Sequence, residues 1–491
     1  MIGDSADQLR AVDNLRKRCS FSPESQKRFA SISGDWNPIH TDAVAARRTS
    51  AGRPVVHGMH VVLIALEHTA ELFSPLPTVR RLSARFLKPI YVAEEVSLDW
   101  SKDSDNVTVR ARIAGVTAAE LRLHLDSSQI SQEQFQVFPH DDRGACQELS
   151  LDEMTGRFGT VRPAASSDTL KQQYPGTAKW LGVNQVAGLL CLSRLVGMEC
   201  PGLQSLFSAL DIEFGIGNTS PVLAYKVESV DHRFRRLKIA IDGLGLQGRI
   251  EAFARHPSTS QPSMQELSRV VGPREFQGQR ALIVGGSRGL GELTAKILAA
   301  GGGVPVITYA AGKEDAERVV KEISNSGGRC ECLKYDIASP AEVQLARLAS
   351  PVAAAYYFAS CQIFRRRTEA FNPELLDEFL AFYVHGFYQL CTALRTVSPA
   401  GIAVFYPSST AVEERPREMT EYAMAKAAGE ILCADLNRFC PGIGIQVRRL
   451  PRLPTDQTSS LVPVKAADPI ETILPIVREL QSFALRSGAN R

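Results

Sequence analysis

The sequence lacks the features that would place this protein in a membrane or an oxidising compartment. No apolar run reaches the ~18 residues that a membrane span needs, and Met1–Ser5 has no charged head followed by an apolar core. The ten cysteines include no Cys-x-x-Cys pair, and Cys330 and Cys332, which alternate in an expected strand, lack further ligands for a metal. We therefore predict a reduced, cytoplasmic protein with neither a membrane span nor a metal site.

An excess of charge of either sign is also missing. The chain has 56 basic and 53 acidic residues, a net charge of +3, and no long basic run, which excludes a nucleic-acid partner. Its 491 residues are 44% hydrophobic and 22% charged, as in ordinary globular proteins. That length is too great for one hydrophobic core and predicts roughly three domains.

Residues 1 to about 20 are expected to form a leading helix. A second helix start is predicted at Phe21–Glu24, with Ser22 as the cap and Pro23 in the first turn.

A short loop near the N-terminus carries the first candidate site. The run Gly34-Asp35-Trp36-Asn37-Pro38-Ile39-His40 places a carboxylate and an imidazole five residues apart, on a segment that glycine lets turn and proline stiffens. Such a loop can hold Asp35 and His40 against one small-molecule site. The simpler interpretation is that Asp35 and Asn37 only form a turn, because turns use these residues everywhere.

An apolar helix is expected to follow this loop. Pro54–Met59 leads into Val61–Leu66, which we interpret as a buried helix entered through Gly58. The start of such a helix offers free N–H groups and a positive dipole end to a carbonyl oxygen that develops negative charge. An acid/base pair beside an oxyanion site is what adding water to an unsaturated thioester, or removing it, requires.

Together with Ala84–Val92, these two elements resemble the MaoC-like, (R)-specific enoyl-CoA hydratase family of hot-dog folds. The resemblance implies that Asp35 and His40 are catalytic and hold the water that is added or expelled. It also implies that substrate binding involves Gly58, whose N–H receives the thioester oxygen, and Asn37, which shapes the loop.

The pattern partly repeats farther along the chain. A helix is expected over Gln185–Val196 and strands at Leu210–Phe214 and Arg236–Ile241, but no second Asp-x-Asn-Pro-x-His motif accompanies them. Arg194 and His232 are expected at the surface of this region.

These patterns predict the fold class and the domain boundaries. The N-terminal region is an α+β double hot-dog, with a hydratase unit over 1–140 and a second, degenerate unit over 141–257. Residues 258–277, rich in serine and proline without clear periodicity, are the predicted linker. Residues 278–491 are predicted to form an α/β Rossmann-like, doubly wound parallel sheet.

The last domain opens with a nucleotide-binding pattern. Arg280–Val284 is a short apolar strand, a glycine turn follows, and Glu292–Ala300 is helical, an order that forms a phosphate cradle at a helix N-terminus. The candidate cofactor-binding residues are Gly285, Ser287, Arg288, Gly289, Leu290 and Gly291 of the turn, Lys313 and Asp336 after the next strands, and Tyr422 and Lys426.

The second catalytic set is Ser409, Tyr422 and Lys426. Ser409 precedes Tyr422 by thirteen residues, and Lys426 follows by four, on the same helix face. The Lys426 cation is expected to lower the pKa of the Tyr422 phenol, which passes a proton to a carbonyl oxygen held by Ser409 while hydride reaches the carbon. Alone, Tyr-x-x-x-Lys is commonplace on exposed helices, so this interpretation depends on the glycine turn upstream.

Residues 278 to about 480 resemble the short-chain dehydrogenase/reductase family, nearest the bacterial 3-oxoacyl thioester reductases. Three positions depart from its pattern. Val284 replaces a threonine, Phe358-Ala359-Ser360 replaces an Asn-Ala-Gly run, and Tyr383 replaces the asparagine that supports a proton-relay water in the family. His385 is a candidate to compensate for that asparagine.

The choice of cofactor follows from charge. Tyr309–Gly312, at the end of the second strand, offers no acidic residue to a free ribose 2′-hydroxyl. Arg288 and Lys313 instead place cations where a 2′-phosphate would lie, so NADP(H) is favoured over NAD(H).

Both resemblances together predict a bifunctional enzyme that reduces 3-oxoacyl thioesters and dehydrates the (3R)-hydroxy product. Its partners would be acyl-CoA or acyl-carrier-protein thioesters of fatty-acid, polyketide or related secondary metabolism, and the reductase family implies a homodimer. One alternative is the oxidative direction, as in peroxisomal multifunctional enzymes, which carry the reductase-like domain first. Another is that one domain is a silent binding or docking module.

Overall fold

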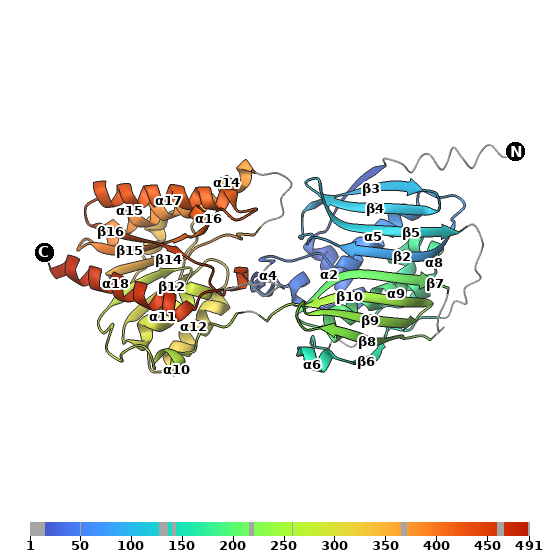
Figure 1. Cartoon of the computed structure of the whole chain (residues 1–491), viewed down its shortest axis with the longest axis horizontal. Coiled ribbons are helices and arrows are strands. Elements are labelled where there is room, and N and C mark those ends of the chain that lie inside the picture. The colour runs from blue at the N-terminus through green and yellow to red at the C-terminus, as the bar shows by residue number, and fades with distance from the viewer. Residues whose placement is uncertain are drawn as a thin grey trace. The chain divides into compact units, whose positions relative to one another are not determined.

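The computed structural model describes residues 15–49, 51–126, 136–139, 144–215, 220–257, 259–364, 371–458 and 466–489. The described chain forms two compact units, one before residue 258 and one after it (Figure 1).

The first unit contains one antiparallel sheet of ten strands. They are β1 (Arg16–Ser20), β2 (Thr78–Phe86), β3 (Glu95–Asp103), β4 (Asn106–Ile113), β5 (Val116–Asp126), β6 (Phe158–Val161), β7 (Ser205–Phe214), β8 (Leu223–Asp231), β9 (Arg236–Gly243) and β10 (Leu246–Ala254). Their order in the sheet is β1-β3-β4-β5-β2-β7-β10-β9-β8-β6. Buried and less buried residues alternate along most strands, so the sheet turns one face to a core and the other outward.

Two helices cover the inner face of this sheet. They are α5 (Gly58–Ala70) and α9 (Val183–Arg194), and α9 continues as the π-helical turn η1 (Leu195–Glu199). Shorter helices complete the unit: α2 (Pro23–Ser33), α3 (Pro38–Thr41), α4 (Ala43–Arg47), α6 (Leu151–Met154), α7 (Ser167–Gln173) and α8 (Pro175–Leu181). One continuous hydrophobic core joins both long helices to the strands.

The two halves of this unit have the same order of elements. In each half an edge strand, a long helix and four strands follow one another, β1-α5-β2-β3-β4-β5 and β6-α9-β7-β8-β9-β10. In each half the first of the four strands neighbours the last, and the edge strand pairs with the second. Antiparallel pairing of β2 with β7, with Leu82 opposite Ile212, joins the halves into one sheet.

Two expectations about the first residues had different outcomes. The predicted helix start is confirmed, since Ser22 accepts a hydrogen bond from the Ser25 N–H and Pro23 is the first residue of α2. A leading helix over residues 1–20 is wrong where it is described, because Arg16–Ser20 is the edge strand β1, paired with β3. Pairing with β3 gives the backbone N–H and C=O groups of Arg16–Ser20 hydrogen-bond partners.

The second unit contains a parallel sheet of six strands. They are β11 (Arg280–Val284), β12 (Val304–Tyr309), β13 (Glu331–Lys334), β14 (Ala354–Tyr357), β15 (Ile402–Ser409) and β16 (Ile443–Leu450), in the order β13-β12-β11-β14-β15-β16. The order reverses between β11 and β14, which is where doubly wound sheets bind nucleotides. The predicted Rossmann-like parallel sheet is confirmed.

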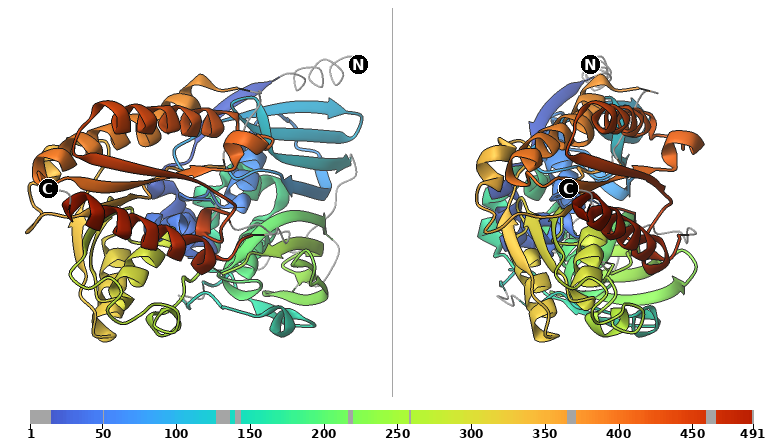
Figure 2. Two further views of the ribbon diagram at one scale, coloured as in Figure 1. Left: turned by 60° about the vertical axis from the view of Figure 1, so that its left-hand side comes forward. Right: turned by 90° about the vertical axis from the view of Figure 1, so that its left-hand side faces the viewer.

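Helices cover both faces of the parallel sheet. One face packs against α11 (Gly289–Ala300), α12 (Lys313–Asn325) and α18 (Pro469–Ala489); the other packs against α13 (Ala341–Leu345), α14 (Pro373–Leu380), α15 (Phe387–Val397) and α17 (Thr420–Phe439). Figure 2 shows α18 and α17 on opposite sides of the sheet. A π-helical turn η2 (Ala381–Gly386) precedes α15, α16 (Ala411–Glu414) follows β15, and the short helix η3 (Asp456–Thr458) follows β16.

The predicted linker over 258–277 is wrong in its described part. This segment contains α10 (Met264–Leu267), and Met264, Leu267, Val271 and Phe276 are buried in the core of the second unit. Its Ser-Pro composition led to the linker prediction, but the apolar residues between these breakers pack against α11.

Among the described residues no single helix has the length and hydropathy of a membrane span. One pair, Pro175–Leu181 with Val183–Glu199, qualifies only when the two helices are taken together, and they meet at 111°.

Replacing Phe276 by Ala tests whether this segment belongs to the second unit. Phe276 is 2% exposed and packs against Gly301, so the second unit should lose about 3–5 kcal/mol of unfolding free energy. All three tryptophans, Trp36, Trp100 and Trp180, lie in the first unit. The variant should therefore shift the urea transition seen by circular dichroism and leave the tryptophan fluorescence transition in place.

The matched control is Phe158→Ala, since Phe158 is 79% exposed. Equal behaviour of the two variants would contradict the packing of residues 259–277 into the second unit.

Candidate active sites

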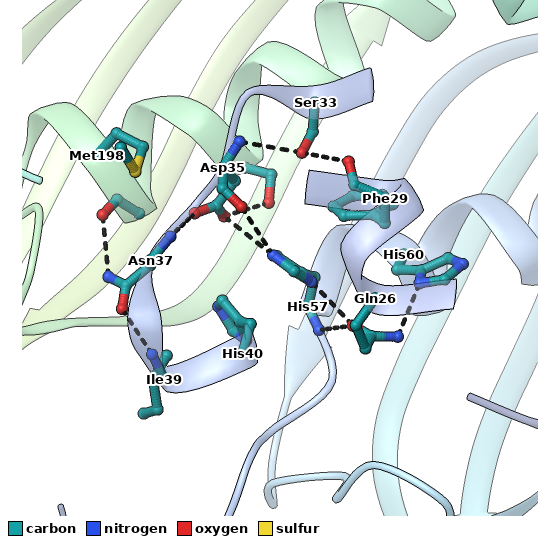
Figure 3. A network of polar contacts seen from close by, with 12 residues as sticks. Gln26, Phe29, Ser33, Asp35, Asn37, Ile39, His40, His57, His60 and Met198 are labelled. Carbon is teal, nitrogen blue, oxygen red and sulfur yellow. Dashed lines mark hydrogen bonds and ion pairs between the residues drawn. The ribbon is translucent and has the colours of Figure 1, made fainter. Parts of the chain in front are cut away.

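Asp35 lies at the centre of a buried polar cluster in the first unit (Figure 3). Gly34 ends α2 in a left-handed conformation, and Asp35 follows at 2% exposure. Its Oδ1 accepts a hydrogen bond from the Asn37 N–H at 3.2 Å, and its Oδ2 accepts one from the Ser193 hydroxyl at 2.7 Å. Burial raises the pKa of Asp35, and His40 and the two hydrogen bonds oppose that shift.

His40 is a half-buried base candidate beside this carboxylate. Its Nδ1 lies 2.7 Å from the Val55 carbonyl oxygen, and because a carbonyl only accepts, Nδ1 carries the proton and Nε2 has a lone pair. Burial lowers the pKa of His40, while the Asp35 charge opposes the shift. The ring stacks on His57, with centroids 3.8 Å apart and planes 26° apart.

Asn37 is bonded to protein groups of both halves of the unit. Its side chain is fully buried and caps α3 by accepting the Ile39 N–H, while its Nδ2 donates to the carbonyls of Gly197 at 2.9 Å and Gly202 at 3.1 Å. These contacts fit the loop-shaping role of Asn37, and its assignment to substrate binding stays a prediction.

Gly58 is the first residue of α5, so its N–H lies at the helix N-terminus, outside the intrahelical hydrogen bonds. A Cβ at this position would meet the Phe86 ring at 3.0 Å. The close approach explains why the helix starts on a glycine. Because Gly58 is the first residue of α5, the helix itself provides no acceptor for its N–H.

Sequence reasoning missed two residues from the second half that surround Asp35. Ser193, in the last turn of α9, donates to the carboxylate, and a Cβ on Gly197, in the turn η1, would lie 2.1 Å from Asp35 Oδ1. A serine and a glycine four residues apart at the end of an apolar helix were the available signal. Arg194, expected at the surface, is only 6% exposed, because α9 lies in the core, whereas His232 is exposed as expected.

Asp35, His40 and His57 offer ligand atoms within 4.8 Å of one another. Both ring nitrogens of His57, however, face protein oxygens: Gln26 Oε1 lies 2.8 Å from Nδ1, and the Asp35 carbonyl lies 3.1 Å from Nε2. A cation would have to displace these contacts, so we propose no metal at this cluster.

The second unit places the glycine turn at the carboxyl end of β11. The N–H groups of Gly285 and Gly286 donate to the Thr308 hydroxyl and carbonyl, both at 3.1 Å, which holds the turn against β12. A Cβ on Gly291 would lie 2.3 Å from the Gly285 carbonyl oxygen, so the first turn of α11 reaches the loop only because this residue is glycine. This close cradle at a helix N-terminus fits a dinucleotide pyrophosphate.

The other predicted cofactor residues differ in burial and in the groups they contact. Ser287 is buried, Leu290 packs against the core, and Gly289 begins α11. Arg288 lies 3.6 Å from the Asp456 carboxylate, and Lys313, at the start of α12, pairs with Glu317 at 3.2 Å. Asp336 is exposed after β13 and accepts the Ala338 N–H.

The structure brings Ser409, Tyr422 and Lys426 together. Ser409 ends β15 and forms a hydrogen bond with Tyr422 on α17, and Lys426 Nζ donates to the Pro407 carbonyl at 2.7 Å. Burial raises the pKa of Tyr422 to about 12 and lowers that of Lys426 to about 7. The expected lowering of the tyrosine pKa by the lysine is therefore wrong here, because desolvation outweighs it.

Tyr383 and Ser360, two of the departures from the reductase pattern, contact each other at this site. Their hydroxyl oxygens are 2.6 Å apart, and Lys426 Nζ lies 3.8 Å from the centroid of the Tyr383 ring. The fully buried phenol thus occupies the space next to the lysine. His385 is exposed, so the expectation that it compensates is wrong.

Residues 7–121 match the MaoC like domain family, and residues 279–451 match the short chain dehydrogenase family. The chain combines a MaoC-like dehydratase domain with a short-chain dehydrogenase domain.

Relatives cover each domain separately. The mitochondrial 3-hydroxyacyl-(acyl-carrier-protein) dehydratase of Arabidopsis thaliana is 34% identical over 18% of this chain and 52% of that protein. The uncharacterized oxidoreductase YgfF of Escherichia coli is 28% identical over 34% of this chain and 72% of that protein. The match thus spans about half of the plant dehydratase.

A short chain dehydrogenase of Burkholderia cenocepacia, solved in complex with NADP, is 24% identical and is similar over 41% of this chain and 90% of its own, with a TM-score of 0.37.

Replacing Asp35 by Asn should stabilise the MaoC-like domain at neutral and higher pH. The folded pKa of Asp35 lies above its ordinary value, so the stability it contributes is present at low pH and lost as pH rises through the folded pKa. Asparagine cannot ionise and keeps the contacts with Ser193 and Asn37. Urea unfolding followed by tryptophan fluorescence should show a gain at pH 8 that narrows toward pH 4.

Asp168→Asn, at an exposed position on α7, is the control and should show no such gain. A variant at position 35 less stable than the wild type at pH 8 would contradict the raised pKa.

Proposed function

We propose that this protein is a bifunctional 3-oxoacyl-thioester reductase and (3R)-hydroxyacyl-thioester dehydratase. The observation that carries the proposal is that one chain contains two complementary acid/base sites, Asp35 with His40 and Ser409 with Tyr422 and Lys426. The alcohol made by the second site is the substrate of the first. The name of the Arabidopsis relative supports a hydroxyacyl thioester as the substrate class of the MaoC-like domain.

We assign the roles of His40 and Asp35 in the dehydration from where each residue carries its proton. His40 Nε2, which has the lone pair, removes the α-proton of the substrate, and the C–H electron pair forms the new double bond. Asp35, whose raised pKa favours the protonated form, gives its proton to the leaving β-hydroxyl, and water departs. Because the two groups interact, they titrate as a pair that holds one proton between them.

The Gly58 N–H at the start of α5 is proposed to bind the thioester oxygen. Charge develops on that oxygen while the α-proton is removed, and a helix N-terminus stabilises it.

We propose further that the ten-stranded region is a double hot-dog. The repeated element order and matching strand neighbours of the two halves support this assignment. The second half lacks the catalytic motif, and its contribution to the site is Ser193 and Gly197 beside Asp35.

In the reductase domain the glycine turn, Arg288 and Lys313 would hold NADP(H), which supplies hydride when bound. Tyr422 gives its phenolic proton to the carbonyl oxygen of the substrate, and Ser409 holds that oxygen by a hydrogen bond. Lys426 is buried four residues along α17, with its Nζ 5.8 Å from the centroid of the Tyr422 ring, and would restore the tyrosine proton.

A second candidate is that the reductase domain is a silent binding module. The contact between Tyr383 and Lys426 favours it, because the phenol fills the position of the family's relay asparagine.

A combined assay with separate variants tests the two activities. Purified protein incubated with NADPH and acetoacetyl-CoA should consume NADPH and yield hydroxyacyl and enoyl masses. Asp35→Asn should still consume NADPH but lose hydration of crotonyl-CoA by about 100-fold or more, and Tyr422→Phe should show the reverse.

Unchanged hydration in Asp35→Asn would move that site elsewhere in the chain. Absence of NADPH consumption by the wild type, with NADH and carrier-bound substrate also tried, would favour the silent module.

Arg288→Ala tests the proposed cofactor preference. Losing a charge-assisted contact to the 2′-phosphate should raise the KM for NADPH about tenfold or more, and the KM for NADH should change little. Lys321→Ala, exposed on α12, is the control. Equal effects of Arg288→Ala on both cofactors would contradict the assignment of Arg288 to the 2′-phosphate.

A further inference from the structure

One side chain, Gln26 on α2, joins the dehydratase site to the start of α5. It is completely buried, and its Oε1 lies 3.1 Å from the His57 backbone nitrogen and 2.8 Å from His57 Nδ1. Its Nε2 lies 3.0 Å from His60 Nδ1 (Figure 3). A glutamine amide with these three contacts has one allowed orientation.

The orientation assigns protons to both histidines. A backbone N–H always donates, so the amide atom facing His57 is the oxygen, and His57 Nδ1 must carry a hydrogen to donate to it. The amide nitrogen then donates to His60 Nδ1, which leaves the His60 proton on Nε2. Burial lowers the pKa of His60 to about 3, in agreement with a neutral ring.

The charge of His57 matters because of its neighbours. Its ring stacks on His40, and its Nε2 lies 4.0 Å from Asp35 Oδ2. A cationic His57 would repel the proton that the Asp35–His40 pair needs. Burial, His40 and His60 lower the pKa of His57 and favour its neutral form. The Asp35 carbonyl, 3.1 Å from Nε2, opposes them, because only a ring that is also protonated at Nε2 could donate to it. Arg255, after β10, lowers the pKa of His40, as burial does.

We propose that Gln26 is a positioning residue of the dehydratase site. It accepts the Nδ1 proton of His57 without supplying a negative charge, and so holds a neutral, Nδ1-protonated His57 flat against His40. The site thereby keeps the basicity of His40 while its ring is fixed by stacking. This inference rests on the proposed dehydratase function.

Gln26→Glu tests the proposal with almost no change of shape. The carboxylate should turn His57 into a cation, which lowers the proton affinity of the Asp35–His40 pair. The alkaline limb of the pH profile for crotonyl-CoA hydration should move down by about one pH unit, a loss of about tenfold at its alkaline end. Gln172→Glu, the same substitution at an exposed position of α7, should leave the profile unchanged.

Ring-nitrogen NMR of the wild-type protein, labelled at its nine histidines, gives a readout independent of catalysis. His57 should show protonated Nδ1 and unprotonated Nε2 without titrating between pH 6 and 8, and should become doubly protonated in Gln26→Glu. An Nε2-protonated or freely titrating His57 in the wild type, or a Gln26→Glu variant with the wild-type profile, would overturn the proposal. If the wild-type protein does not hydrate crotonyl-CoA, the proposed dehydratase function is refuted, whatever the NMR shows.

Discussion

The MaoC-like domain depends on burying one carboxylate between two halves of the sheet. Asp35 leaves water almost completely, a change that is unfavourable for its charged form. Hydrogen bonds from the Ser193 hydroxyl and the Asn37 N–H replace part of its hydration. Gly197, which has no Cβ, leaves room for the carboxylate. The same desolvation that makes the residue costly to ionise supports its proposed role as a proton donor.

This arrangement explains why the second half is present without a catalytic motif of its own. Its long helix packs in the shared core and ends in a π-helical turn beside the Asp35 loop. Asn37, from the first half, donates to two carbonyl groups of the second half at this point. Neither half alone would enclose the carboxylate, so the site needs both.

Desolvation also governs the reductase site, with a different balance. Tyr422 and Lys426 are both buried, and each is pushed toward its neutral form. Lys426 lies against the face of Tyr383, whose ring attracts a cation without accepting a hydrogen bond in its plane. Tyr383, bonded to Ser360, therefore places a buried aromatic ring at the position where the family pattern has an asparagine.

Local patterns in the sequence determined much of this protein. The Ser22-Pro23 helix start, the apolar helix after Gly58, the alternating strands and the strand-turn-helix around Gly285 depend on neighbours within a few residues, and these were predicted. For the same reason, local motifs pointed to the proposed chemistry; their residues are Asp35, His40, Ser409, Tyr422 and Lys426.

Only the tertiary structure decided how these residues are tuned. Ser193 meets Asp35 across 158 positions of sequence, and the stacking of His57 on His40 depends on how the start of α5 lies against α3. The segment 259–277 belongs to the second unit because Phe276 packs in the core of that unit, a contact that the composition of the segment does not reveal. Contacts between distant segments, and the desolvation they cause, set the pKa values and the protonation of each ring, and no local pattern in the sequence records them.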